Sequence, residues 1–375
     1  MNILFIGNIT SFHDLKWASF FADKANYKIY FLPSSPCKKF NINKFLVLKP
    51  LPNFSIIKFY KIIKGIYLLK KNIKKYKIDV VHISFATPNA FWGLFLPTKF
   101  VIATHGSDIL IVMPNLLKTK GIRKFYNIIL WKLLRKSFEK ASAITCASDL
   151  LKREICKIVS NKNKIHIVRS GVNIEAIDEA NTDISYLIKS NKKIIFSSRY
   201  VNAVYDTFIQ AKAIALLPDN IINEYIFVFI RPTISDYSKM VENYLENIKL
   251  VKPAFEYVFL PRMSQSEMFS VLKKSSLVIM TPISDGTPSS ALEAMAAKKP
   301  LIISDLNYDE EIFKETCMRF TRRTPEELAN LIVTALENYP LDMINNAYEK
   351  VIKYGNIKTE MNKLEHIYKS VWYKN

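Results

Sequence analysis

The stretch SDGTPSSALEAMAAKKP, at Ser284–Pro300, decides the fold of this chain. The unbroken apolar run before it, Ser276–Met280, predicts a buried strand, and the run after it, Leu301–Asp305, predicts another. Between them, small residues and good helix formers end at two lysines and a proline, the usual pattern of a helix C-terminus. A strand, a loop, a helix and a second strand in this order predict an α/β unit.

The loop before this helix has the features of an anion site. Asp285 and Gly286 turn the backbone, and Thr287 and Pro288 suit the N-cap and the first helical position. The free amides of such a helix N-terminus attract phosphate. Asp285 and Glu293 can both accept hydrogen bonds from a vicinal diol such as that of ribose. The alternative is that one acid complements the helix dipole and the other is an ordinary surface residue.

Composition sets the broad class of the protein. With 375 residues, of which 49% are apolar, the chain is long enough for two folded domains. Lysine and arginine number 54 against 33 acids, and this net charge of +21 predicts an anionic partner. That partner is nucleic acid, an acidic lipid surface or a phosphorylated molecule, unless the excess is a compositional bias of the source. Since no nucleic-acid reading motif accompanies the charge, we expect no nucleic-acid partner.

The cysteines and the N-terminal residues predict a cytoplasmic location. None of the four cysteines has a Cys-x-x-Cys partner or a histidine at metal spacing, so we expect reduced thiols and no metal site: Cys37, Cys146, Cys156 and Cys317. The first residues enter a strand without the basic region and cleavage site of a secretion signal. We also expect no membrane-spanning helix, because no run of about 18 uncharged apolar residues occurs.

The first half of the chain predicts a doubly wound α/β domain. Its first strand, Asn2–Gly7, ends at a single glycine rather than Gly-x-Gly-x-x-Gly, which argues against a nicotinamide enzyme. His105–Asp108 follows a strand at 100–104 and therefore lies at the edge where open α/β sheets bind ligands. Further strands are expected at 29–32, 80–84, 143–146 and 164–168, and helices at 14–23, 121–139 and 149–158.

A lysine-rich helix is expected at residues 58–77. Apolar residues at spacings of three and four form one stripe, eight lysines lie between them, and the segment contains no acid. The stripe predicts packing against the domain core, with a solvated basic face. That face can also attract an anionic membrane, at about 1 kcal/mol per cation near the surface.

A second α/β series follows a polar segment at 174–192, which we interpret as a linker. Strands are expected at 193–197, 225–230 and 256–260, and helices at 207–217, 237–248, 265–274 and 325–337. Residues 343–373 predict one or two closing helices. Two successive α/β halves of similar size would each present the carboxyl ends of their strands for ligand binding.

The chain closely resembles the family-4 retaining glycosyltransferases of the GT-B fold, also described as glycosyl transferases group 1. The resemblance rests first on SDGTPSSALEAMAAKKPLIISD and on the preceding FLPRMSQSEMFSVLKKSSLVIMTP. It extends to Ser198-Arg199, to Ser170–Asn173 and to His105–Asp108, in an order that covers nearly the whole chain.

The resemblance implies two Rossmann-like domains that face a central cleft, with a C-terminal helix returning to the N-terminal domain. In this chain the domains would be 1–178 on the acceptor side and 179–350 on the donor side, with residues 351–375 as the closing helix. It also implies transfer of a sugar from a nucleotide-sugar, with retention of anomeric configuration and without a metal or other cofactor.

Site residues are implied at the matching positions. Glu293 resembles the ribose-binding glutamate, Asp285 the acid that contacts the transferred sugar, and Arg199 the arginine that neutralises the diphosphate. His105 resembles the histidine beside the reacting sugar. The loop whose amides approach sugar and diphosphate would be Gly286, Thr287, Pro288 and Ser289, and the acceptor side would include Gly7, His82 and Asp108. The alternatives are a surface ion pair for Arg199 and structural roles for His105, His82 and His13.

This chain departs from the family pattern at several positions. Asp285 stands where a glutamate is usual, and no lysine follows Arg199 at the expected place. Arg231 and Arg262, each just beyond a strand, are the predicted substitutes. The glycine pair expected after Ile230 is missing, as is the glycine at Lys298.

Together these patterns predict a cytoplasmic glycosyltransferase, peripherally associated with the inner face of the cell membrane. Its acceptor would be a glycan or a lipid-linked glycan, as in bacterial surface polysaccharide assembly. The alternatives are a catalytically inactive GT-B protein that binds nucleotides, and an inverting GT-B transferase.

Overall fold

The computed structural model describes residues 1–36, 42–53, 58–321 and 323–373. Cys37, which was expected to be a reduced thiol, lies outside them. The chain forms two units: residues 1–170 with 360–375, and residues 171–359. The sequence had suggested boundaries at 178/179 and 350/351. The last helix, α16 (Ile357–Tyr373), begins in the second unit and continues into the first.

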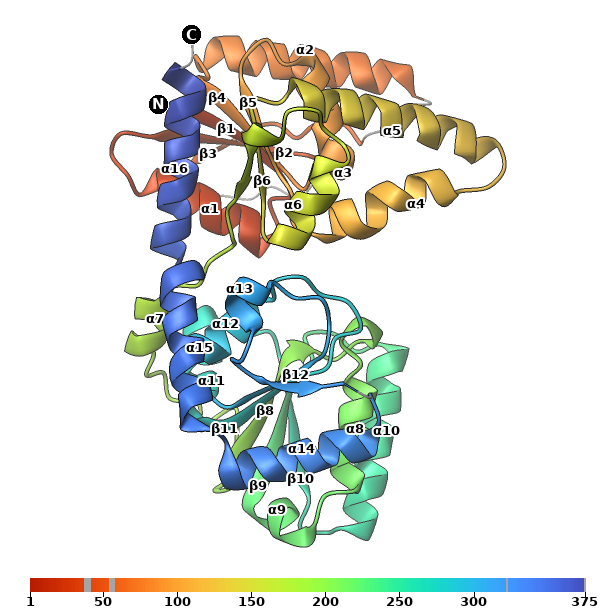
Figure 1. Cartoon of the computed structure of the whole chain (residues 1–375), viewed down its shortest axis with the longest axis vertical. Helices are drawn as coiled ribbons and strands as arrows, with labels where there is room; N and C mark the ends of the chain where they lie inside the picture. The colour runs from red at the N-terminus through yellow and green to blue at the C-terminus, as the bar shows by residue number, and fades with distance from the viewer. Residues whose placement is uncertain (37–41, 54–57, 322, 374–375) are drawn as a thin grey trace. The chain divides into compact units, whose positions relative to one another are not determined.

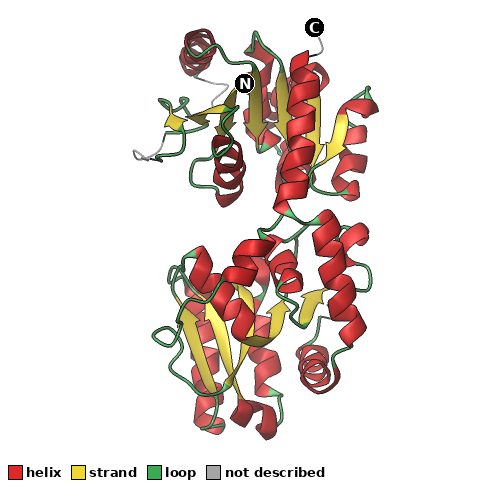
Figure 2. Ribbon diagram, turned by 90° about the vertical axis from the view of Figure 1, so that its left-hand side faces the viewer, coloured by secondary structure: helices red, strands yellow, loops and turns green. Residues whose placement is uncertain are grey.

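The first unit is a seven-stranded parallel sheet with the order β3-β2-β1-β4-β5-β6-β7 (Figures 1 and 2). Its strands are β1 (Asn2–Gly7), β2 (Lys28–Pro33), β3 (Leu46–Val47), β4 (Val80–Ser84), β5 (Phe100–Ala103), β6 (Ala143–Cys146) and β7 (Ile165–Ile167). Its helices are α1 (Phe12–Ala22), α2 (Phe59–Lys75), α3 (Ala86–Asn89), η1 (Ala90–Phe95), η2 (Asp108–Val112), α4 (Met113–Lys118), α5 (Ile122–Lys140), α6 (Asp149–Cys156) and η3 (Lys162–Lys164).

Alternate residues of the central strands pack against different helices. Leu4 and Ile6 of β1, with Val81 and Ile83 of β4, join the buried cluster that includes the apolar stripe of α2. The residues between them, Phe5 and His82, contact each other on the opposite face. There α1 and α16 close the core, with Phe21 of α1 against Tyr368 of α16.

The second unit repeats this plan with six parallel strands in the order β10-β9-β8-β11-β12-β13. Its strands are β8 (Lys193–Tyr200), β9 (Tyr225–Ile230), β10 (Glu256–Leu260), β11 (Ser275–Met280), β12 (Leu301–Ser304) and β13 (Met318–Phe320). Its helices are α7 (Ile174–Glu179), η4 (Ala203–Tyr205), α8 (Thr207–Ala215), α9 (Asp219–Glu224), α10 (Asp236–Val251), α11 (Gln265–Lys274), α12 (Ser289–Ala296), α13 (Glu310–Phe313), α14 (Pro325–Asn338) and α15 (Leu341–Tyr354).

Two local predictions were wrong. The segment 174–192 is not a linker: it forms α7 and buries Ile177, Ile184 and Ile188 in the core of the second unit, because its apolar residues recur among the polar ones. The helix after Gly286 begins one residue later than predicted. Pro288 has an extended backbone (φ −68°, ψ 119°) and occupies the N-cap, so that α12 starts at Ser289.

Each sheet has a switch point where the strand order reverses, between β1 and β4 in the first unit and between β8 and β11 in the second. Ligands of open α/β sheets bind at the carboxyl edge beside such a point. Within the described residues, no helix is both long and apolar enough to cross a membrane.

Candidate functional site

The first unit has a cavity of about 590 Å³ at the switch point of its sheet. Chain segments that follow β1, β4 and β5 supply most of its wall, because these neighbouring parallel strands end at the same edge. The lining is mostly small and polar: Asn8, Ser11, His13, Asp14, Ser34, Ser35, Asn53, Phe85, Thr87, Pro88, Asn89 and His105.

Asp14 is the buried acid of this cavity, with 4% of its surface exposed. Its Oδ2 accepts a hydrogen bond from the Asn8 backbone N–H at 2.8 Å, and its Oδ1 accepts one from the Ser84 hydroxyl. Burial raises the pKa of Asp14, and the nearby His105 opposes that rise. Gly7 makes room for the carboxylate, since a Cβ there would lie 2.4 Å from Asp14 Oδ2.

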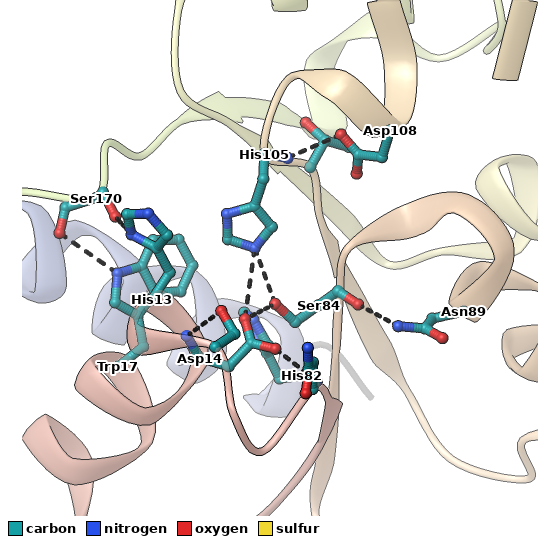
Figure 3. Close-up of polar contacts among 12 residues, drawn as sticks. His13, Asp14, Trp17, His82, Ser84, Asn89, His105, Asp108 and Ser170 are labelled. Atoms are coloured by element: carbon teal, nitrogen blue, oxygen red, sulfur yellow. Dashed lines mark hydrogen bonds and ion pairs between the residues drawn. The ribbon is translucent and has the colours of Figure 1, made fainter. Parts of the chain in front are cut away.

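His105 completes a chain of hydrogen bonds that begins at Asp14 (Figure 3). Its Nε2 lies 2.8 Å from Ser84 Oγ and 3.8 Å from Asp14 Oδ1. While Asp14 is ionised it can only accept, so the Ser84 hydroxyl donates to it and accepts from His105 Nε2–H. A neutral His105 then carries its lone pair on Nδ1, where it can accept a hydrogen bond from a hydroxyl group.

Asp108 shapes the loop that carries His105. The residue is fully buried, and its Oδ1 accepts from the backbone N–H groups of His105 at 3.0 Å and Gly106 at 2.9 Å. Its Oδ2 accepts from the N–H of Ala86 at 2.8 Å, next to the cavity wall. Gly106 has φ +118°, a conformation that favours glycine. The acceptor-side candidate Asp108 therefore acts on the backbone of this wall.

His82, another acceptor-side candidate, faces α16 rather than the cavity. It is fully buried, its Nδ1 lies 2.8 Å from the Tyr368 hydroxyl, and its ring packs on Phe5 and Trp17. Burial lowers the pKa of His82 to about 3, so it is neutral at physiological pH. His13 does line the cavity, and its Nδ1 lies 2.5 Å from Ser170 Oγ.

In the second unit, Arg199 and Asp285 meet at the switch point of the sheet. Arg199 is the penultimate residue of β8 and Asp285 follows β11. Arg199 Nη2 donates to Asp285 Oδ2 at 2.7 Å. Arg199 Nη1 donates to Ser290 Oγ, on the first turn of α12, at 3.1 Å. The guanidinium also stacks on the Tyr205 ring, 4.1 Å from its centroid. Sequence reasoning had brought Arg199 and Asp285 to one site but did not identify Ser290 or Tyr205.

Two buried donors remain unsatisfied beside this ion pair. Among the described residues, Arg199 Nε and Ser289 Oγ have no hydrogen-bond partner. Burial raises the pKa of Asp285, and the neighbouring Arg199 opposes that rise. Buried donors at a helix N-terminus, beside a guanidinium, suit the oxygens of a phosphate or diphosphate.

The remaining donor-side candidates lie along α12 and the loop before it. Glu293 is half-buried on the second turn of the helix, and Thr287 is half-buried before it. The Gly286 backbone N–H donates to Asp285 Oδ1 at 2.8 Å. A Cβ on Gly286 would meet nothing within 4 Å, so this backbone is open to a ligand.

The two arginines that were predicted to replace the missing lysine, Arg231 and Arg262, lie in different environments. Arg231 Nη1 donates to Glu242 Oε2 at 2.7 Å, and its guanidinium stacks on Phe259 at 4.0 Å. Arg262 is exposed. A third arginine, Arg323, lies 3.5 Å from Asp206 through its Nη2. Asp206 belongs to the loop after β8 in which the lysine was expected, and Arg323 was not a candidate from the sequence.

Asp14 and Ser84 are the main functional candidates that sequence reasoning missed. The side chain of Ser11 caps α1 by accepting the Asp14 N–H, so Asp14 resembles an ordinary first-turn acid. Ser84 is simply the last residue of an apolar strand. The sequence did contain a signal for both: Asp14 lies in the helix that follows β1, and Ser84 ends β4, so both were expected near the carboxyl edge that His105 also follows.

Comparisons with known proteins point to one family over both units. The sequence model described as Glycosyltransferase Family 4 matches residues 23–176, and that described as Glycosyl transferases group 1 matches residues 178–355. "Uncharacterized glycosyltransferase MJ1178" of Methanocaldococcus jannaschii is 23% identical over 311 residues, which cover 80% of this chain and 78% of that protein.

Solved structures share the fold over the full length. A glycosyltransferase from Rickettsia africae has a TM-score of 0.75 at 18% identity, covering 100% of this chain and 99% of its own. Anabaena HepE, in complex with UDP, has a TM-score of 0.72 at 14% identity, with 99% and 100% covered. HepE has also been solved with UDP-glucose.

Proposed function

The chain belongs to the group 1 glycosyltransferases of the GT-B fold, and we propose that it moves a sugar from a nucleotide-sugar donor to a hydroxyl of a glycan or lipid-linked acceptor. Family and fold are as the sequence predicted. The proposal goes further in naming the donor class, retention of anomeric configuration and a role in bacterial surface polysaccharide assembly. The observation that carries it is the Arg199–Asp285 pair beside α12, with two unsatisfied donors next to it.

On the donor side, Arg199 and the first turn of α12 would hold the diphosphate. Its oxygens would compete with Asp285 for the guanidinium and would accept from Arg199 Nε and Ser289 Oγ. Negative charge develops on the leaving phosphate, so a fixed cation lowers the barrier most where it contacts that group. HepE, a structural neighbour, binds UDP and UDP-glucose.

We also propose that transfer needs no metal or other cofactor. The charge that a divalent ion would otherwise neutralise falls to Arg199 and the helix N-terminus. Glu293, on the second turn of α12, would accept hydrogen bonds from the ribose diol.

On the acceptor side, the cavity of the first unit suits an uncharged sugar. Its amides and hydroxyls can pair with sugar hydroxyls, and Phe85 offers an aromatic face. Among its described lining residues, the ionisable side chains are Asp14, His13 and His105, and no lysine or arginine is present to bind an acceptor phosphate. The reacting end of the acceptor would therefore be neutral.

A peripheral position on the cytoplasmic face of a membrane would bring the enzyme to a lipid-linked acceptor. Helix α2 buries Ile62, Leu69 and Ile73 and leaves Phe59 and Tyr67 more than half exposed among its lysines. A helix with this surface can bind an anionic interface by charge while its stripe stays in the core.

The experiment is transfer by the purified protein from a panel of nucleotide-sugars, comparing wild type with Arg199→Ala and Glu293→Ala. Arg153→Ala, at an exposed arginine of α6, is the matched control. We expect both site variants to lose turnover and the control to keep it. Turnover that is equal in all four proteins would remove the donor-site assignment, and nucleotide binding without turnover would indicate an inactive member.

An inverting reaction is the second candidate, because the Asp14–Ser84–His105 chain leaves a lone pair on His105 Nδ1 that could take a proton from the acceptor hydroxyl. Proton NMR of the first product formed distinguishes the two, since it reports the anomeric configuration directly. A retained configuration supports our proposal, and an inverted one replaces it.

A further inference from the structure

The helical hairpin made by α4 and α5 carries exposed apolar side chains. Figure 1 shows these two helices as a pair that extends from the sheet of the first unit, with the α4–α5 turn at the far end. We define the hairpin face by its exposed apolar residues on η2, α4 and α5: Leu110, Ile111, Val112, Leu117, Phe125 and Tyr126. Phe125 is 67% exposed and Leu117 43%, which is high for residues of this size.

The part of the hairpin that bears this face carries cations and no acids. Between Ile109 and Phe138 the sequence contains no aspartate or glutamate. Exposed cations lie around the α4–α5 turn and on the first turn of α5: Lys118, Lys120, Arg123 and Lys124. Phe125 and Tyr126, near the start of α5, contact each other, and Phe125 is the more exposed of the two.

We propose that the hairpin face docks into the interface of an anionic lipid bilayer, with Phe125 and Leu117 entering the acyl boundary and the surrounding cations contacting headgroups. Aliphatic and aromatic side chains contribute favourable binding free energy only where they leave water. Cations contribute it where they approach negative charge. An anionic lipid surface offers both, whereas a nucleic acid offers little to leucine or isoleucine. A second copy of this chain would bring one cationic hairpin against another.

The position of the hairpin face relates it to the acceptor cavity. Helix η2 begins at Asp108, whose carboxylate holds the backbone of Ala86 and His105 at the cavity wall. Leu110, Ile111 and Val112 therefore follow the cavity wall directly along the chain. This part of the inference rests on the proposed function, in which the acceptor is lipid-linked. The lipid of such an acceptor would remain in the bilayer under the hairpin face while its sugar enters the cavity.

Flotation with vesicles tests the docking. The full-length protein is mixed with vesicles of equal parts phosphatidylglycerol and phosphatidylcholine, and the partition coefficient is measured at low and high salt. Leu117→Ser with Phe125→Ser should lower it about tenfold at either salt concentration, because apolar insertion is not screened. Leu250→Ser with Val251→Ser is the matched control, since both residues are exposed and apolar but lie on α10 of the second unit. An unchanged partition of the hairpin variant would overturn the proposal.

A fluorescence measurement tests insertion itself. Phe125→Trp should shift its emission to the blue on adding these vesicles and should be quenched by brominated acyl chains, whereas Leu250→Trp should show neither change. Absence of both changes at position 125 would contradict insertion. If the serine variant instead loses binding to duplex DNA, or loses self-association, while floating like wild type, the hairpin face serves another partner and the proposal is wrong.

The test of the docking surface can fail or succeed independently of the test of the proposed function. The Leu117 and Phe125 substitutions lie outside the catalytic and binding residues, so transfer to a short soluble acceptor should keep its wild-type rate. If no transfer occurs with any donor but flotation responds as expected, the proposed function fails and the docking surface stands. If transfer is normal and flotation is unaffected by the serine variant, only the docking surface fails.

Discussion

The switch points of the two sheets hold different kinds of polar site. In the second unit an ion pair, Arg199 with Asp285, lies at the N-terminus of α12. In the first unit a carboxylate, Asp14, is linked through Ser84 to His105, and the lining residues that the structure describes include no arginine or lysine. The same strand order thus places an ion pair suited to an anionic group in one unit and a hydrogen-bond chain suited to neutral hydroxyl groups in the other. The surrounding charges, and not the fold, set the ligand class.

The largest effect is expected from removing the cation of the second unit. Arg199→Ala should lower kcat/KM for nucleotide-sugar by about 1,000-fold, since the cation is lost where the leaving group gains charge. The same change leaves Asp285 without its partner, and the pKa of Asp285, already raised by burial, should rise further. Steady-state kinetics with Arg199→Lys as the control tests this. A loss below tenfold would show that another group neutralises the donor.

The next effect concerns the carboxylate of the first unit. Asp14→Asn keeps the shape of the side chain but removes the charge that orients Ser84 and His105, and we expect kcat/KM to fall about 100-fold. Because burial raises the pKa of Asp14, the wild-type rate should fall as acidification protonates it. The variant should lose that part of the pH profile. Wild-type rate and profile in Asp14→Asn would show that the hydrogen-bond chain has no role in the reaction.

Two of the donor-side candidates, Asp285 and Glu293, could be named together from the sequence because they are close along the chain. They belong to one strand-loop-helix unit, whereas Arg199 precedes Asp285 by 86 residues and was assigned to the same site only by the family resemblance. What the sequence could not provide was side-chain geometry. The sequence pattern did not predict that Arg199 stacks on Tyr205, or that Pro288 is the N-cap of α12 and not its first residue.

The acceptor side was less predictable because it is assembled from distant segments. Asp14, Ser84 and His105 come from three parts of the chain, and only the order of the strands brings them to one edge. His82 illustrates the converse. It belongs to β4 like Ser84 and, two residues earlier, points to the same face of the sheet. It lies back from the carboxyl edge, however, and there it meets Tyr368 of α16 instead of the cavity.

That buried histidine gives a pH-dependent test of stability in the first unit. The folded pKa of His82 is about 3 against an ordinary 6.5, so below pH 6.5 the unfolded state binds a proton that the folded state does not. The free energy of unfolding should therefore fall by about 1.4 kcal/mol per pH unit from this group as pH drops toward 3, and its contribution is fully present above 6.5. Urea unfolding of wild type and His82→Asn at several pH values measures the difference in slope. Equal slopes would mean that His82 is protonated in the folded protein.

The smallest expected effect decides which cation assists Arg199. Arg231 is held by Glu242 and Phe259, whereas Arg323 is 3.5 Å from Asp206, in the loop after β8 that also carries Tyr205. A cation at that loop is near the guanidinium that stacks on Tyr205, so Arg323→Ala should raise the KM for nucleotide-sugar about fivefold, the size of one partly exposed ion pair. Arg231→Ala should leave KM unchanged, and Arg153→Ala controls for lost surface charge. If Arg231→Ala has the larger effect on KM, the ion pair between Arg231 and Glu242 must open when the donor binds. The second cation of the site would then be Arg231, which follows β9, and not Arg323, which follows β13.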